Sequence, residues 1–277
     1  MNAIELNQVT KTYPGFTLGP ISLTLPSGCV MGLIGENGAG KSTAIKLMLD
    51  MIRRDGGTVS LLGKDPRKDP LIREDIGVVM DEVGFPGCLN ARQIEAVLRR
   101  CYRRWDSDAY TQLLHRFHVP CDKPFKAFSR GNKMKLGLAA AMSHHARLLL
   151  LDEATSGLDP VVRDELLDLF LDFTRDESHS ILLSSHIVSD LDKVCDYAAF
   201  LHKGKLLLCE EKDRLCEAYA LVHGTAEQLS ALPTPLGMRR TPYGAEAVVP
   251  RASLPVGMEG SPVELEQLFI WMAKEAD

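Results

Sequence analysis

The stretch "GENGAGKST", residues 35–43, decides the fold, because it places a glycine-rich loop between a strand pattern and a helix pattern. The apolar run at 29–34 precedes it as a buried strand would, and residues 41–52 continue it as a helix. The fixed positions of a G-x-x-x-x-G-K-[ST] motif are Gly35, Gly40, Lys41 and Ser42. Strand, loop and helix in this order predict a phosphate-binding loop in an α/β domain.

The chemistry of such a loop follows from its residue types. Glycines let the backbone wrap around phosphates, with successive N–H groups pointing inward, and the helix N-terminus adds partial positive charge. Lys41 would reach the β- and γ-phosphates of a nucleotide, and the Ser42 hydroxyl could hold Mg²⁺. The candidate nucleotide-binding residues of this loop are Gly35, Glu36, Asn37, Gly38, Ala39, Gly40, Lys41, Ser42 and Thr43.

Polar side chains also follow two further apolar runs. Asp152 and Glu153 come directly after four leucines, and His186 follows "SILLSS" at 180–185. A carboxylate at Asp152 is suited to hold Mg²⁺ through water, and one at Glu153 to polarise an attacking water. His186 could meet the γ-phosphate. The alternatives are a helix N-cap for the acidic pair and an ordinary structural role for the histidine.

The remaining pattern predicts several subdomains. Residues 3–9 and 21–25 alternate between apolar and polar side chains, which predicts strands. Apolar residues at helical spacing begin at Leu89 and continue with breaks to about His145, which predicts helices. Asp159 and Pro160 suit the N-cap and first position of a further helix. Prolines become frequent after about residue 217, which predicts a small appendage whose last helix is signalled by "SPVE" at 261–264.

Bulk composition excludes several classes of protein. The 277 residues carry a net charge of −5, which gives no drive toward nucleic acid, and the arginines at 92–104 read as a solvated helix face. No apolar run approaches the roughly 18 residues of a membrane span, and the start lacks a secretory signal. Seven cysteines without a CxxC pair argue against disulfides or zinc and favour a cytosolic protein.

These motifs together resemble the ATP-binding subunit of an ABC transporter over about residues 2–215. "GENGAGKST" resembles the family's Walker A motif, "LLLLDE" its Walker B motif and "SGLD" its D-loop, whose Asp159 joins the nucleotide-binding set. His186 matches the family's switch histidine, and Tyr13 in "KTY" matches the aromatic residue that stacks on adenine. Other segments are similar to a bacterial exporter branch of the acetoin-utilisation and antibiotic-export type.

The segment "FSRGNKMKLG", residues 128–137, occupies the place of the family signature Leu-Ser-Gly-Gly-Gln. The resemblance implies that Ser129 and Gly131 contact the γ-phosphate of ATP held by an opposite subunit. Arg130 departs from the family, which has glycine there, and a plain Ser N-cap is the alternative for Ser129. Asp81 stands where the family places a glutamine that touches Mg²⁺, so it could contact the cation, or it could be a solvated loop carboxylate.

The resemblance implies an α/β P-loop NTPase fold of ABC type. It has a mixed sheet core, an N-terminal antiparallel β-subdomain and an inserted helical subdomain at about 84–145. We expect an ATP-binding domain at 1–217 and a small α+β appendage at 218–277.

The implied function is ATP hydrolysis that powers a separate integral-membrane permease, through a homo- or heterodimer of ATP-binding subunits with ATP and Mg²⁺ bound. We expect a chain without a membrane span or nucleic-acid partner, cytoplasmic and peripheral on the inner face of the cell membrane. A soluble ABC-type ATPase outside transport and a regulatory subunit with low turnover remain alternatives.

Overall fold

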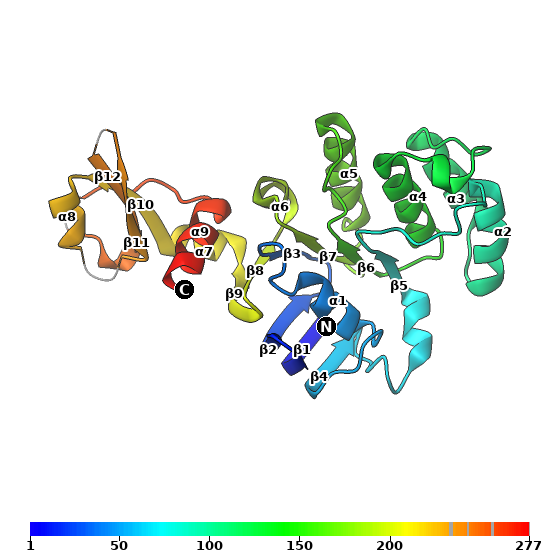
Figure 1. Cartoon of the computed structure of the whole chain (residues 1–277), viewed down its shortest axis with the longest axis horizontal. Coiled ribbons are helices and arrows are strands. Elements are labelled where there is room, and N and C mark those ends of the chain that lie inside the picture. Colours follow the sequence, from blue (N-terminus) through cyan, green and yellow to red (C-terminus); the bar gives the residue numbers. More distant parts are fainter. Residues whose placement is uncertain (233–234, 243, 256–257, 277) are drawn as a thin grey trace.

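The computed structural model describes residues 1–232, 235–242, 244–255 and 258–276. Its centre is a six-stranded sheet with two further sheets and a set of helices around it (Figure 1). The strand order of the central sheet is β5 (Ile76–Val79), β6 (Leu148–Asp152), β7 (Ser180–Ser185), β3 (Val30–Ile34), β8 (Tyr197–His202) and β9 (Lys205–Glu211). The strands pair in parallel except for the β8–β9 hairpin. The predicted mixed sheet is therefore confirmed.

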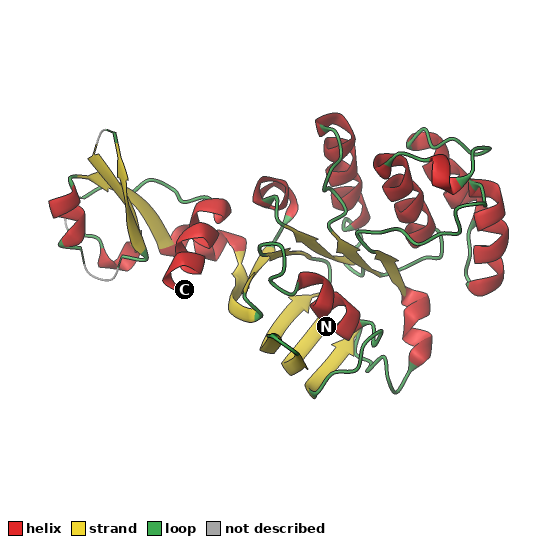
Figure 2. Cartoon of the chain, viewed as in Figure 1, coloured by secondary structure: helices red, strands yellow, loops and turns green. Residues whose placement is uncertain are grey.

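The core strands are apolar on both sides because both faces of the sheet are covered, as is usual for parallel sheets. Every residue of β3, β6 and β7 is buried. Figure 2 shows most of the large helices on one side of this sheet and the N-terminal sheet on the other. The helices of the first group are α2 (Ala91–Cys101), α3 (Ser107–Arg116), α4 (Arg130–Met142), α5 (Pro160–Phe173) and α6 (Val188–Val194).

The N-terminal antiparallel sheet has the order β2 (Phe16–Pro26), β1 (Asn2–Tyr13) and β4 (Gly56–Leu61). The helix α1 (Lys41–Met48) packs between it and the central sheet, where Ile45 and Met48 share an apolar cluster with strand residues of both sheets. The strand alternation expected at the start of the chain is confirmed. This packing holds the beginning of α1 firmly against the end of β3.

The helix after the phosphate loop is shorter than its pattern predicts. It ends at Met48 rather than at about residue 52, and Asp50 has a left-handed φ of +55° that stops further helical turns. Gly56 and Gly57 begin β4, although paired glycines are typical of turns. A Cβ on Gly57 would lie 2.3 Å from the carbonyl oxygen of Gln8, so glycine is needed for the close approach of β4 to β1.

The expected helical segment at about 84–145 contains the helices α2, α3 and α4. The helix α2 ends at Cys101, and the ring of Tyr102 lies beyond it, stacked on His144 at 4.1 Å. Ala91 and Ile94 are the buried face of α2. The arginines of its outer face, Arg92, Arg99 and Arg100, are exposed, so the prediction of a solvated face agrees with the structure.

The C-terminal appendage is a three-stranded sheet with flanking helices. Its elements are α7 (Lys212–Ala218), β10 (Tyr219–Gly224), α8 (Ala226–Ser230), β11 (Gly237–Thr241), β12 (Gly244–Pro250) and α9 (Leu265–Glu275). In Figure 1 the sheet β10–β12–β11 lies away from the central sheet, whereas α9 returns toward it. Phe269 of α9 meets Phe200 of β8 edge to face at 5.4 Å. The last helix is thus joined to the main core.

The predicted start of this last helix is wrong by three residues. Ser261 does not cap it; the backbone of Ser261 instead exchanges two hydrogen bonds with Leu221 of β10. Glu264 is the N-cap, and its capping box is completed by Gln267. The "SPVE" pattern fits a capping box locally, but pairing with β10 holds Ser261 in an extended bridge.

Candidate nucleotide-binding site

The candidate site lies where neighbouring parallel strands end. In the register of the central sheet, Ile34 of β3 pairs with Ser185 of β7, and Asp152 of β6 pairs with Ser184 of β7. Because the strands are parallel, the segments that follow them emerge at the same edge of the sheet. The phosphate loop, Glu153 and His186 are brought together in this way from positions far apart in the sequence.

The phosphate loop depends on glycine where its backbone makes close contacts. Gly40 has a φ of +109°, and a Cβ there would lie 2.6 Å from Leu18 Cδ1. A Cβ on Gly35 would lie 2.5 Å from the carbonyl oxygen of Leu201. Gly38 also has a left-handed φ, of +84°, but faces open space. Side chains at positions 35 and 40 would therefore displace the loop. The loop leads into α1, whose first N–H groups have no hydrogen-bond partner within the helix and can bind a ligand.

A hollow of about 340 Å³ opens in front of this loop. It is lined by Phe16, Glu36, Asn37, Gly38, Gly40, Lys41, Ser42, Thr43, Asp81 and Glu153. The hollow is polar, and its lining includes a lysine and the first residues of α1. That combination suits a nucleotide's phosphates.

Glu153 is the centre of the charged groups in this hollow. One carboxylate oxygen lies 3.0 Å from Lys41 Nζ, and the other lies 2.7 Å from His186 Nδ1. Lys41 is 5% exposed and also donates to the carbonyl oxygens of Gly35 and Glu36, at 2.7 and 3.2 Å. The sequence placed Lys41 at the end of the phosphate loop and placed Glu153 and His186 after two apolar strands. Only the structure shows that one carboxylate bridges the lysine and the histidine.

The backbone of Glu153 is held in an uncommon conformation. Its φ is +53°, which costs a non-glycine residue of order 1 kcal/mol or more. Its N–H donates to both the carbonyl oxygen and the Oγ of Ser184, at 3.1 and 3.2 Å. These two bonds fix the direction in which the carboxylate leaves the strand. Ser184 is therefore a positioning residue that the sequence pattern did not single out.

Asp152 is buried behind the hollow. It is 1% exposed, and Ser184 Oγ donates to its Oδ1 at 2.5 Å. In the described part of the chain, no cluster of three or more His, Cys, Asp or Glu side chains could hold a metal ion by itself. Mg²⁺ at nucleotides is bound through one or two carboxylates together with phosphate oxygens and water, so a nucleotide site does not need such a cluster. Of the residues predicted to hold Mg²⁺, Ser42 and Asp81 line the hollow and Asp152 does not, so their role as metal ligands stays a prediction.

The aromatic residue at the hollow differs from the predicted one. Phe16 of β2 lines the hollow, and its ring lies 3.1 Å from where a Cβ on Gly40 would stand. Tyr13 pairs with Phe16 across the β1–β2 hairpin and is 38% exposed, with Lys11 Nζ 5.4 Å from its ring centre. Stacking of Tyr13 on adenine stays a prediction. The sequence motifs did not single out Phe16, which pairing of β1 with β2 brings to the hollow.

The signature residues lie apart from the hollow of their own chain. Ser129 is the N-cap of α4, and its Oγ accepts from Asn132 N at 3.3 Å. Gly131 lies in the first turn of α4, and Asp159 caps α5 by accepting from Val162 N at 3.1 Å. The lining of the phosphate hollow includes none of these three residues. Ser129 and Gly131 lie at the start of α4, and Asp159 lies at the start of α5.

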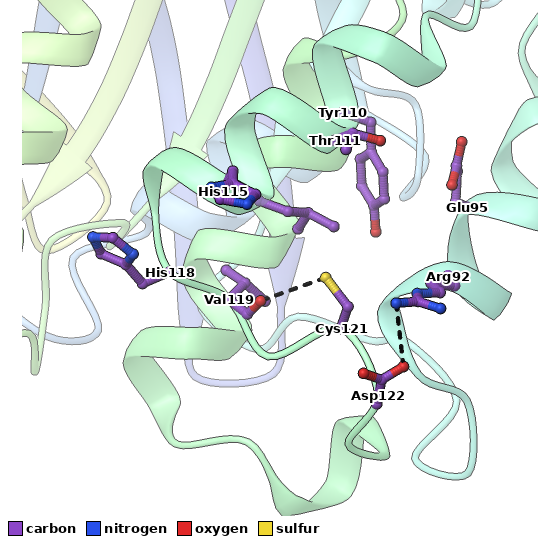
Figure 3. A pocket seen from close by; sticks show the side chains of 10 residues that line it. Arg92, Glu95, Tyr110, Thr111, His115, His118, Val119, Cys121 and Asp122 are labelled. Carbon is purple, nitrogen blue, oxygen red and sulfur yellow. Dashed lines mark hydrogen bonds and ion pairs between the residues drawn. The ribbon is translucent and has the colours of Figure 1, made fainter.

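A second hollow, of about 610 Å³, lies in the helical segment (Figure 3). It is formed between α2, α3 and the loop that follows α3, with Arg92 and Asp122 3.5 Å apart at its rim. The side chains of Tyr110, His115 and Cys121 also line it. It contains none of the predicted site residues.

Comparison with known proteins agrees with this geometry. A family model described as ABC transporter matches residues 18–156, which include the phosphate loop, Asp152 and Glu153. The chain belongs to the ABC transporter family. As an ATP-binding protein of this family, it binds ATP and hydrolyses it to drive transport.

Two curated relatives are about one-third identical to this chain in sequence. The ABC transporter ATP-binding protein YtrB of Bacillus subtilis is 33% identical over 217 residues, which are 78% of this chain and 74% of the relative. The bacitracin transport ATP-binding protein BcrA of Enterococcus faecalis is 32% identical over 209 residues, 74% of this chain and 68% of the relative.

The fold of this chain also resembles the folds of solved structures. The dimeric structure of MJ0796, a bacterial ABC transporter cassette, superposes with a TM-score of 0.68 at 21% identity and covers 75% of this chain and 98% of that one. Within the described residues, no helix of this ABC transporter protein is both long and apolar enough to cross a membrane.

Proposed function

We propose that ATP hydrolysis by this ABC transporter protein powers a separate integral-membrane permease, and that the protein acts in a dimer of ATP-binding subunits. The observation that carries this proposal is the position of Glu153. Its carboxylate borders the phosphate hollow and contacts both Lys41 and His186. A carboxylate held by a lysine and a histidine beside a phosphate loop is suited to work on a water molecule at the γ-phosphate.

The residues of one chain have different roles in phosphate binding, metal binding and proton transfer. Lys41 and the N-terminus of α1 bind and orient the phosphates, because they place positive charge and N–H donors around the hollow. Mg²⁺, held by Ser42, Asp152 and Asp81, would neutralise charge on the β- and γ-phosphates. When Lys41 binds the phosphates, its ion pair with Glu153 is broken and the carboxylate can accept a proton from water. The contact with His186 Nδ1 keeps the carboxylate oriented.

The remaining contacts to ATP are proposed to come from a second subunit. Ser129, Gly131 and Asp159 lie at helix starts outside the hollow of their own chain, so they are available to a nucleotide presented by another copy or by a related subunit. A dimeric cassette of similar fold supports this arrangement. Each of two ATP molecules would then be enclosed between the phosphate loop of one subunit and the signature loop of the other.

We propose export as the direction of transport, with the protein at the inner face of the cell membrane through its permease. The likeness to a Nod factor export ATP-binding protein of Sinorhizobium fredii supports this direction. The permease would choose the cargo, because the residues of the hollow recognise the nucleotide.

Glu153→Gln tests the proposed engine. We expect the variant to bind ATP as the parent does, to lose turnover by orders of magnitude and to accumulate an ATP-bound dimer, because the amide keeps the shape of the carboxylate without its basicity. Calorimetry, phosphate release and light scattering measure the three properties. Glu82→Gln removes a nearby exposed carboxylate outside the phosphate hollow and serves as the control. Turnover at the parent rate in Glu153→Gln would refute the role of Glu153.

A further inference from the structure

Two charged side chains stand where the family has neutral residues, and they contact each other. A guanidinium nitrogen of Arg130 forms an ion pair with Asp81 Oδ1, across 49 residues of sequence. Asp81 follows β5 of the central sheet, whereas Arg130 is the first residue of α4. The pair therefore ties the end of a core strand to the beginning of the helix that carries the signature.

The same guanidinium lies over the loop that follows Glu153. A Cβ added to Gly157 would lie 3.4 Å from both Cδ and Nε of Arg130 and 3.5 Å from its Cζ. Gly157 has no side chain, so the arginine lies against its bare backbone, and its φ of +70° disfavours other residues there. Arg130 thus connects three segments: the end of β5, the start of α4 and the D-loop.

Asp81 has a second possible partner, because it borders two hollows. One is the phosphate hollow with Lys41 and Glu153, and the other, of about 470 Å³, is lined by Asp81, Arg130 and their neighbours. A carboxylate at this boundary can turn either toward a cation among the phosphates or toward Arg130. Both partners are positively charged, so a carboxylate that contacted both would bring two like charges close together, and contact with one weakens contact with the other.

We propose that the Asp81 carboxylate exchanges between Arg130 and the cation bound with nucleotide at the phosphate loop, so that magnesium-nucleotide binding releases Arg130 and the start of α4. This inference rests on the proposed nucleotide site. It differs from the family pattern, in which neither position is charged. The exchange links occupation of the hollow to the freedom of the signature loop within one chain.

The size of the coupling is limited by the strength of the ion pair. The side chains of Arg130 and Asp81 are 51% and 49% exposed, so solvent screens their attraction and the pair contributes little. By reciprocity, Arg130 can weaken magnesium-nucleotide binding only by the amount that the nucleotide weakens the pair. We therefore expect an effect of about two- to fivefold on affinity.

The experiment measures the magnesium gain for ADP, which is the dissociation constant in excess EDTA divided by that in excess Mg²⁺. ADP is used because it avoids both hydrolysis and ATP-driven dimerisation. Calorimetric titrations of the full chain compare the parent, Arg130→Gln, Asp81→Asn and the double variant. Lys133→Gln removes a second positive charge that lines the same hollow and serves as the matched control.

The exchange predicts a defined pattern of gains. Arg130→Gln raises the magnesium gain about two- to fivefold, because Asp81 no longer has a competing partner. Asp81→Asn lowers the gain, and in that background Arg130→Gln has no further effect. An unchanged gain in Arg130→Gln, an equal effect of Arg130→Gln with and without Asp81, or the same increase in Lys133→Gln overturns the exchange. Failure of the parent to bind ADP would instead refute the nucleotide site.

Discussion

Gly131→Asp separates the fold of one subunit from the contact between two. In the structure, a Cβ on Gly131 would meet only Leu158 Cδ2, at an ordinary contact distance of 3.4 Å. Gly131 is the second residue of α4, after the Ser129 cap and Arg130. Aspartate in a first helical turn interacts well with the helix dipole, and it replaces a poor helix former. We therefore expect the isolated subunit to become more stable, by about 1 kcal/mol.

The same substitution should prevent closure of the ATP-bound dimer. In the proposed arrangement the new carboxylate would face the γ-phosphate of the opposite subunit. Two like charges about 4 Å apart at an effective dielectric constant of about 20 repel each other by about 4 kcal/mol. That is roughly a thousandfold loss in affinity for each of the two sites. The subunit should remain monomeric in ATP at micromolar concentration.

The assay is light scattering with ATP in the Glu153→Gln background, where hydrolysis cannot reverse closure. Gly131→Asn matches the size of the new side chain without its charge, and calorimetry confirms that each variant still binds ATP. Thermal melting checks that the fold is kept. If Gly131→Asp dimerises as readily as its parent, the loop is only a helix start and the proposed sandwich of two subunits fails.

Three further outcomes follow from the site and the core. Lys41→Ala should abolish ATP binding in calorimetry, because the β- and γ-phosphates lose their buried cation; unchanged affinity would remove the assigned role. Arg130→Gly should retain turnover in a phosphate-release assay, since it restores the family's residue, and a large loss would contradict this. Burial lowers the pKa of His144, whose Nε2 is without a hydrogen-bond partner. The unfolded chain therefore binds more protons below about pH 6.5, and stability should fall from pH 7.5 to 5.5. His144→Phe should flatten this dependence in pH-resolved melting, and an equal slope in both proteins would count against it.

Local patterns were sufficient for the elements that carry the site. The sequence predicted a strand at 29–34, then a glycine-rich loop and a helix from Lys41, and the structure has β3 (Val30–Ile34) followed by the loop and α1. The sequence also placed Asp152 and Glu153 at the end of one apolar strand and His186 after another, which are β6 and β7. Each depends on neighbours in the chain: an apolar run long enough for a buried strand, a glycine where φ is positive, a lysine at a helix start. The family follows from the same short motifs in order, so it too is contained in the sequence.

Element ends were less predictable, because distant partners decide them. The last helix begins after Glu264 since Ser261 is paired with β10, and residues 56–57 are strand because β1 lies beside them. Neither partner is near in sequence. Local signals of a cap or a turn compete there with hydrogen bonds to another strand, and the strand pairing prevails.

Contacts within the site depend on tertiary structure alone. The sequence determined that a lysine stands at a helix start and that a glutamate and a histidine stand at strand ends, but the parallel register of β3, β6 and β7 brings Glu153 to Lys41 and His186. Arg130 and Asp81 departed from the family pattern separately in the sequence, and only the packing of α4 beside β5 pairs them. The physical reason is that short patterns fix backbone conformation, whereas side-chain partners are set by how the sheet orders its strands and how the helices pack on it.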